Sequence, residues 1–181
     1  STAIARRAAA AGAEVLLHLP MEAVEGDDPG PGALWLGMGE AELVATTAAA
    51  LAAVPGAAGI NNHMGSAVTA DAKAMAAVLG LARARGLYYL DSRTTPETVG
   101  FRLARELGLP AAERQVFLDD TLSHEAIHAE FDRLLALAAG EGSAIAIGHP
   151  HAATFELLAE EVPRARAAGF RFVPLSELLV R

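Results

Sequence analysis

The chain has 181 residues, 52% of them hydrophobic and 20% charged, so it can bury a core of its own as one domain over residues 1–181. Its 14 Lys and Arg against 22 Asp and Glu give a formal net charge of -8, which excludes the broad basic surface that nucleic acids attract. Cysteine is absent, so disulfides and thiolate metal ligands are excluded, and any metal must be held by His, Asp or Glu.

Short apolar runs alternate with longer segments of helical character along the chain. The apolar runs are continuous rather than alternating, which is typical of parallel strands covered on both faces. In chain order we expect helix 1–11, strand 14–20, helix 40–54, strand 57–63, helix 70–85, strand 87–91, helix 96–107, strand 115–119, helix 122–139, strand 143–149, helix 152–168 and strand 170–174.

This alternation of strand and helix predicts a parallel α/β sheet or barrel. Three of the helices are expected to end at a glycine that follows basic residues, Gly86, Gly108 and Gly169, which is typical of helix C-caps. The first helix has no strand before it in this chain. We therefore expect at least one further strand to belong upstream of Ser1.

An uncharged run over 43–70 is long enough to span a bilayer. It is interrupted by Pro55, Gly56 and Gly59 and by the polar residues Asn61 and Asn62, and alanine supplies much of its apolar content. These features favour a helix, a turn and a buried strand. No integral membrane segment is predicted in this chain.

Most predicted strands end in side chains that can bind a metal or move a proton. In a parallel α/β barrel the carboxyl ends of all strands open on one face, where the active site is built. A single histidine at a strand end is more often structural, but several such ends in one register favour a functional set. We therefore expect convergence on one face of His18 and Glu22, residues 61–63, residues 91–93, Asp119 and Asp120, and His149 and His151.

The sequence HEAIH, from His124 to His128, fits the H-E-x-x-H pattern of zinc proteases. That interpretation is disfavoured, because a helix cap expected at Asp120 or Thr121 would leave His124 in the first helical turn. The extended protease pattern also fails, since Phe131 stands where it requires glycine. We favour a packing helix with the two histidines on its flank.

Five stretches carry a family resemblance: GINNHMGS (59–66), LDSRTT (90–95), VFLDD (116–120), AIAIGHPH (144–151) and FVPLSELL (172–179). Together they resemble the divergent polysaccharide deacetylase family, which is related to the NodB-homology deacetylases. The resemblance implies a distorted (β/α) barrel that lacks its first strand in this chain. It also implies a periplasmic or envelope-associated protein that removes acetyl groups from a carbohydrate by means of a divalent metal, commonly zinc.

The resemblance also assigns roles to individual residues. His18 matches the first histidine of the family's H-x-x-x-H metal pair, and Glu22 occupies the position of the second. His149 matches the strand-end histidine that acts as general acid, and His151 is an additional histidine. The paired aspartates of the family would lie upstream of Ser1. Chemistry more than alignment gives His63 its role: a metal would be held by His18 and His63, with His149 or His151 and an aspartate from the upstream strand as further ligands.

Chemistry rather than alignment suggests the remaining roles. Asp91 or Glu22 could serve as the catalytic carboxylate or could orient a histidine. Arg93 could hold that carboxylate or a sugar oxygen by paired hydrogen bonds. The rival interpretation is a non-catalytic envelope protein that binds glycan or a protein partner through the same barrel mouth, and Glu22 in place of a histidine favours it.

Overall fold

The computed structural model describes residues 2–180 and divides into two compact units. The first unit comprises the chain up to Glu113 together with the segment from Pro174, and the second unit comprises Arg114–Val173. Parallel strands alternate with helices in both, so the predicted α/β class is confirmed. The single barrel domain expected over residues 1–181 stays a prediction.

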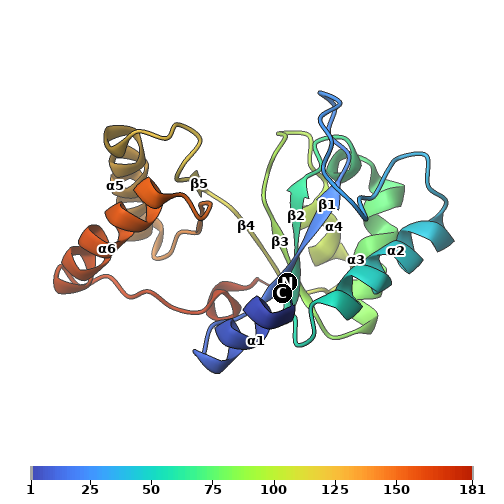
Figure 1. Ribbon diagram of the computed structural model, residues 1–181, viewed down its shortest axis with the longest axis horizontal. Coiled ribbons are helices and arrows are strands. Elements are labelled where there is room, and N and C mark those ends of the chain that lie inside the picture. Colours follow the sequence, from blue (N-terminus) through green and yellow to red (C-terminus); the bar gives the residue numbers. More distant parts are fainter. Residues whose placement is uncertain (1, 181) are drawn as a thin grey trace. The chain divides into compact units, whose positions relative to one another are not determined.

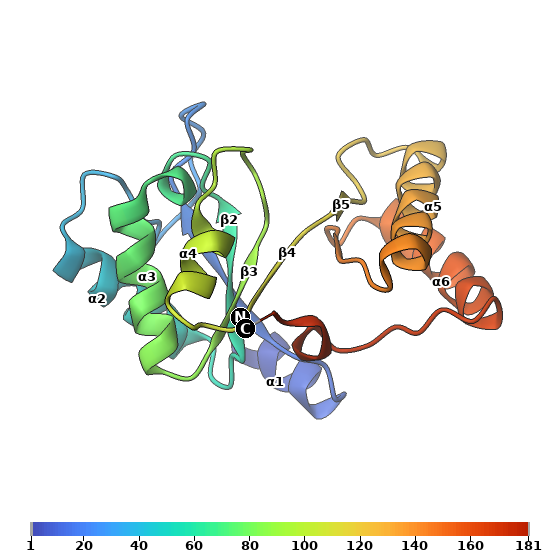
Figure 2. The same ribbon diagram turned by 180° about the vertical axis from the view of Figure 1, so that it is seen from behind.

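A parallel sheet of four strands in the order β1-β2-β3-β4 forms the centre of the first unit. Helices α2, α3 and α4 lie together on one side of it (Figures 1 and 2). The strands are β1 (Leu16–Met21), β2 (Gly59–Met64), β3 (Tyr88–Asp91) and β4 (Ala111–Glu113). The helices are α1 (Thr2–Ala10), α2 (Glu40–Ala53), α3 (Ala72–Ala84) and α4 (Gly100–Glu106), with 3-10 turns at Val68–Ala70 and Leu175–Leu178.

The core of the first unit lies between the sheet and these helices. Successive side chains of a strand point to opposite faces, so Leu17, Leu19 and Met21 of β1 are buried while His18 between them is exposed. Ile60 of β2 and residues of α2 and α3 join the same cluster. The face of β1 and β2 that carries His18 is therefore the face turned away from this core.

The second unit is a smaller α/β structure with its own core. Strands β5 (Val116–Phe117) and β6 (Ala146–Ile147) are parallel, and the helices are α5 (His124–Glu141) and α6 (Ala152–Ala167). Its buried cluster is Val116, Leu118, Ile127, Phe131, Leu157 and Ala165. Helix α5 is capped by Ser123, whose side chain accepts from the Ala126 N–H, so the cap expected at Asp120 or Thr121 was placed wrongly.

Two sequence predictions about strands were wrong. Strand β4 was missed, because three residues of mostly small side chains give no apolar run; it is held by pairing with β3 and by a bridge from Ala111 to Val180. The strand expected at 170–174 is irregular backbone. That segment contains the point at which the chain passes from the second unit back to the first, between Val173 and Pro174, and Phe172 within it is exposed. Among residues 2–180, no helix has the length and apolar character needed to cross a membrane.

The start of β2 requires a glycine because of its neighbour in the sheet. Gly59 pairs with Tyr88 of β3, and a Cβ at Gly59 would lie 2.5 Å from the Tyr88 ring and 2.8 Å from its carbonyl oxygen. The Tyr88 ring cannot move freely, because its hydroxyl donates to Glu14. Glu14 also accepts from the Ser176 N–H, so one carboxylate holds both the Tyr88 ring and the C-terminal segment.

We therefore predict that Gly59→Ala destabilises the protein by about 1–3 kcal/mol, the usual cost of overpacking. Gly80→Ala is the matched control, because Gly80 lies in the exposed part of α3 with nothing within 4 Å of a new Cβ. That change should stabilise the helix by about 0.5–1 kcal/mol. Urea unfolding measures both changes, and equal effects of the two substitutions would contradict the tight packing at Gly59.

Candidate functional site

The carboxyl ends of β1 and β2 bring two predicted metal ligands together. The register pairs His18 with Asn61 and Pro20 with His63, so both histidines lie on the face turned away from the helices. His63 Nδ1 lies 3.1 Å from His18 Nε2, and the two ring centres are 4.8 Å apart. His18 and His63 are therefore neighbours within the first unit, and their role as metal ligands stays a prediction.

A buried network of hydrogen bonds contacts the histidine pair through His18. Asn61 Oδ1 lies 2.6 Å from His18 Nδ1, while its amide nitrogen contacts the Leu90 carbonyl at 3.0 Å and Ser92 Oγ at 2.6 Å. Asn62 accepts from the Ser92 N–H and from the Tyr89 hydroxyl. Burial, followed by the nearby Asp91 carboxylate, raises the pKa of Tyr89, so this phenol stays protonated and can donate. The network joins the carboxyl ends of β2 and β3.

Asp91 is fully buried, and its carboxylate accepts three hydrogen bonds, two from the loop that follows β3 and one from the first turn of α4. The donors are the backbone N–H groups of Arg93 and Phe101, each at 2.9 Å, and the Thr98 hydroxyl at 2.8 Å. These bonds fold the loop and fix the start of α4. The catalytic role suggested for Asp91 stays a prediction, and in this structure its carboxylate has a structural part.

Arg93 and Glu22 also have partners within the first unit. Arg93 has a positive φ of 49°, and its guanidinium forms an ion pair of 2.5 Å with Glu113. Glu22 accepts from the Leu36 N–H at 2.7 Å and so holds the loop after β1. Their catalytic roles stay predictions.

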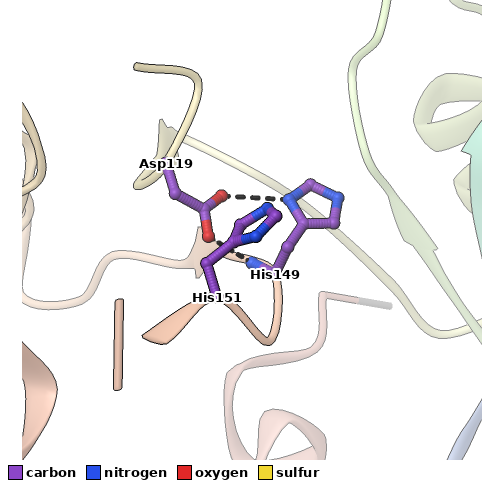
Figure 3. A group of neighbouring side chains, drawn as sticks. All are labelled: Asp119, His149 and His151. Atoms are coloured by element: carbon purple, nitrogen blue, oxygen red, sulfur yellow. Dashed lines mark hydrogen bonds and ion pairs between the residues drawn. The ribbon is translucent and has the colours of Figure 1, made fainter. Parts of the chain in front are cut away.

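The second unit holds a cluster of Asp119, His149 and His151 (Figure 3). His149 Nδ1 lies 3.0 Å from Asp119 Oδ1, and Asp119 Oδ2 accepts from the His149 N–H and from the Thr154 hydroxyl at 2.8 Å. The ligand atoms of the three residues lie within 4.8 Å of one another, so the group could hold a metal. Asp119 is buried, whereas His151 is exposed at the surface.

The electrostatics of Asp119 follow from its hydrogen bonds. Burial by itself would raise the pKa of this carboxyl. The backbone N–H and imidazole of His149 and the hydroxyl of Thr154 outweigh burial, so the pKa of Asp119 lies below its ordinary value. Asp119 is therefore ionised at neutral pH, and its carboxylate holds both the ring and the backbone N–H of His149.

Sequence reasoning placed Asp119 among the strand-end residues but gave it no role, and it did not identify Thr154. The available signal was the parallel pairing of the strand before Asp119 with the strand before His149, which places the two side by side. His149 and His151 were expected to share a cavity with His18, His63 and Asp91. That expectation spans both units and stays a prediction.

The two histidines of HEAIH occupy the flank of α5, as predicted. His124 is the first residue of the helix, and Ile127 and Phe131 form its buried stripe. His128 lies 3.3 Å from Asp132 and 3.7 Å from Glu161, both acidic partners on the helices of this unit. These contacts describe a surface histidine.

Comparison with known proteins confirms the family resemblance. The divergent polysaccharide deacetylase model matches residues 1–179. The chain is 39% identical over 159 residues to the uncharacterized protein YibQ of Escherichia coli, covering 88% of this chain and 50% of that protein. It is 37% identical over 163 residues to an uncharacterized protein of Haemophilus influenzae, covering 90% of this chain and 55% of that protein. The chain thus spans about half the length of these relatives.

A solved structure has the same fold. The crystal structure of an uncharacterized protein from Agrobacterium tumefaciens C58 matches with a TM-score of 0.91 and 24% sequence identity. The match covers 96% of this chain and 71% of that chain. At this level of identity the likeness shows the fold alone.

The lowered pKa of Asp119 predicts how stability depends on pH. Its contribution is fully present above the ordinary pKa of 3.8 and is lost as the pH falls through the lower native pKa. Asp119→Asn should therefore destabilise the protein at pH 7, and the difference from the unmodified chain should shrink below about pH 4. The control is Asp120→Asn, an exposed neighbour whose change should alter stability by less than about 0.5 kcal/mol. Urea unfolding between pH 2 and 7 measures both, and a difference that stays constant over this range would contradict the prediction.

Proposed function

Because the chain belongs to the divergent polysaccharide deacetylase family, we propose that it acts as a metal-dependent hydrolase on an N-acetylated glycan of the bacterial envelope. The observation that carries this proposal is the pair of imidazoles at the carboxyl end of the first unit's sheet, His18 and His63. Family membership supports a carbohydrate amide as the proposed substrate class, and action at the envelope is part of the same proposal.

The histidine pair fits a tetrahedral cation. Zinc binds imidazole nitrogen at about 2.0–2.1 Å, so two such ligands on one tetrahedral ion lie about 3.3 Å apart. His18 Nε2 and His63 Nδ1 are 3.1 Å apart, close to that spacing. Imidazole also suits zinc better than carboxylate or amide oxygen does. We therefore assign the cation to His18 and His63.

The cluster in the second unit suits proton transfer better. Both oxygens of Asp119 already accept hydrogen bonds, two from His149 and one from Thr154, and a cation would compete with these donors. With Nδ1–H directed at Asp119, Nε2 is the atom of His149 that can take up and release a proton. A buried carboxylate behind an imidazole stabilises the imidazolium, as a general acid requires.

The proposed reaction is hydrolysis of the acetamide. A bound divalent cation would polarise the amide carbonyl and lower the pKa of a water molecule. Water adds to the carbonyl carbon and gives up a proton, the departing amine nitrogen takes up a proton, and the C–N bond breaks. Acetate and the free amino sugar are the products. Asp91 and Glu22 contribute by holding the loops after β3 and β1.

We predict that His18→Gln and His63→Gln each lower zinc affinity of the folded chain by more than about tenfold, because an amide is a much weaker zinc ligand than imidazole. Isothermal titration with zinc measures the affinity, and circular dichroism confirms the fold. The double change His124→Gln with His128→Gln is the matched control and should leave zinc binding unaltered. If the control rather than His63→Gln abolished zinc binding, the protease pattern would be the metal site.

His149→Gln separates proton transfer from metal binding. It should leave zinc affinity within about threefold and lower acetate release from N-acetylglucosamine oligomers by about 100-fold or more, the usual contribution of general acid–base catalysis. A His149→Gln chain that loses zinc as His63→Gln does would assign the cation to the Asp119 cluster. A folded chain that binds the oligomers but neither binds zinc nor releases acetate would favour the non-catalytic glycan-binding protein.

A further inference from the structure

We propose that Asn61 is a positioning residue that holds His18 in the tautomer with hydrogen on Nδ1, so that Nε2 presents its lone pair to the cation. The inference rests on the proposed function, since the metal is assigned there to His18 and His63. Asn61 is neutral and buried, and it is neither a metal ligand nor a proton donor in the proposed reaction.

The orientation of the Asn61 amide is set by a neighbouring atom that can only accept a hydrogen bond. Its nitrogen lies 3.0 Å from the Leu90 carbonyl oxygen, which can only accept. Exchanging the amide nitrogen and oxygen would place two acceptors at that distance. The second amide proton is directed at Ser92 Oγ at 2.6 Å, and the Ser92 hydroxyl donates in turn to the Asn62 carbonyl at 2.7 Å. Both amide protons of Asn61 are thus directed at acceptors.

The remaining atom of the amide determines the protonation of His18. Asn61 Oδ1 faces His18 Nδ1 at 2.6 Å, and an amide oxygen can only accept. His18 Nδ1 therefore carries the hydrogen, and in the neutral ring Nε2 is left as the acceptor. That is the atom 3.1 Å from His63 Nδ1 and the one assigned to the cation. A neutral histidine in water favours the opposite tautomer, so this state is imposed by the protein.

Burial makes the constraint rigid. Asn61 is 7% exposed and Ser92 is 4% exposed, and among the described residues no buried side-chain nitrogen or oxygen lacks a hydrogen-bond partner. Rotation of the amide would break three hydrogen bonds at once, each costly to lose in a buried site. Hydrogen-bond partners of metal-bound histidines typically contribute about 10–100-fold to metal affinity. Loss of Asn61 should therefore lower the zinc affinity by a measurable amount.

The first test measures the tautomer in the metal-free chain. With ¹⁵N-labelled histidine at pH 8, correlation of ring nitrogens with ring protons should show His18 protonated at Nδ1 and unprotonated at Nε2. In Asn61→Leu the ring should change to the Nε2–H tautomer, and zinc affinity should fall about 10–100-fold. Finding the Nε2–H tautomer in the unmodified chain would overturn the inference whatever the variants do.

Two further variants separate positioning from general loss of stability. Asn62→Leu removes a neighbouring buried amide that contacts Tyr89 and the Ser92 N–H instead of His18, so it should lower stability while leaving the tautomer and zinc affinity unchanged. Asn61→Asp keeps an acceptor for His18 Nδ1 but loses the donor to Leu90, so it should also be less stable and yet retain the tautomer. Its zinc affinity should be at least that of the unmodified chain.

The outcomes distinguish this inference from the proposed function. An unmodified chain that does not bind zinc overturns the proposed function, and the positioning role with it. If folded Asn61→Leu binds zinc with the same affinity as the unmodified protein, the positioning role alone is overturned. If Asn61→Leu fails to fold, the inference is still tested by the His18 tautomer in the unmodified chain and by the zinc affinity of Asn61→Asp. A lower zinc affinity in Asn61→Asp would contradict the inference.

Discussion

The parallel register between β1 and β2 is the constraint on which the candidate site of the first unit depends. It places His18 beside Asn61 and puts His63 two residues further along the same face. A shift of one residue would turn His18 into the core and bring Leu17 or Leu19 to the opposite face. The buried side chains of β1, packed against α2 and α3, make such a shift costly. Core packing therefore maintains the spacing of two polar side chains outside the core.

Polar residues at these strand ends are costly to bury unless their hydrogen bonds are complete. The structure completes them: Asn61, Asn62 and Ser92 bond to one another and to backbone groups, and Asp91 accepts three hydrogen bonds from the loop after β3 and the start of α4. Two consecutive asparagines at the end of an apolar strand are explained by this network, since one faces the histidines and the other faces Tyr89. A satisfied network of this kind holds side chains in one arrangement.

The sequence predicted most elements because their patterns are local. Continuous apolar runs gave β1, β2 and β3, and helix ends were visible in caps such as Gly86 and Gly108. Strand β4 was out of reach, because Ala111 and Ala112 become a strand through their neighbour β3 and through Val180, far away in the chain. The same reason hid the contact of Asp119 with Thr154, which joins a strand end to a helix 35 residues later. The neighbouring histidines were predictable, because parallel strands end at a common edge.

The two histidines at the centre of the proposed chemistry have different partners, and the difference matches their proposed roles. His18 is held by a neutral amide, which orients the ring without adding negative charge and so does not favour an imidazolium. His149 is held by Asp119, a buried carboxylate whose pKa is lowered by its hydrogen bonds to His149 and Thr154. A metal ligand must stay unprotonated at the binding atom, whereas a general acid must carry a proton.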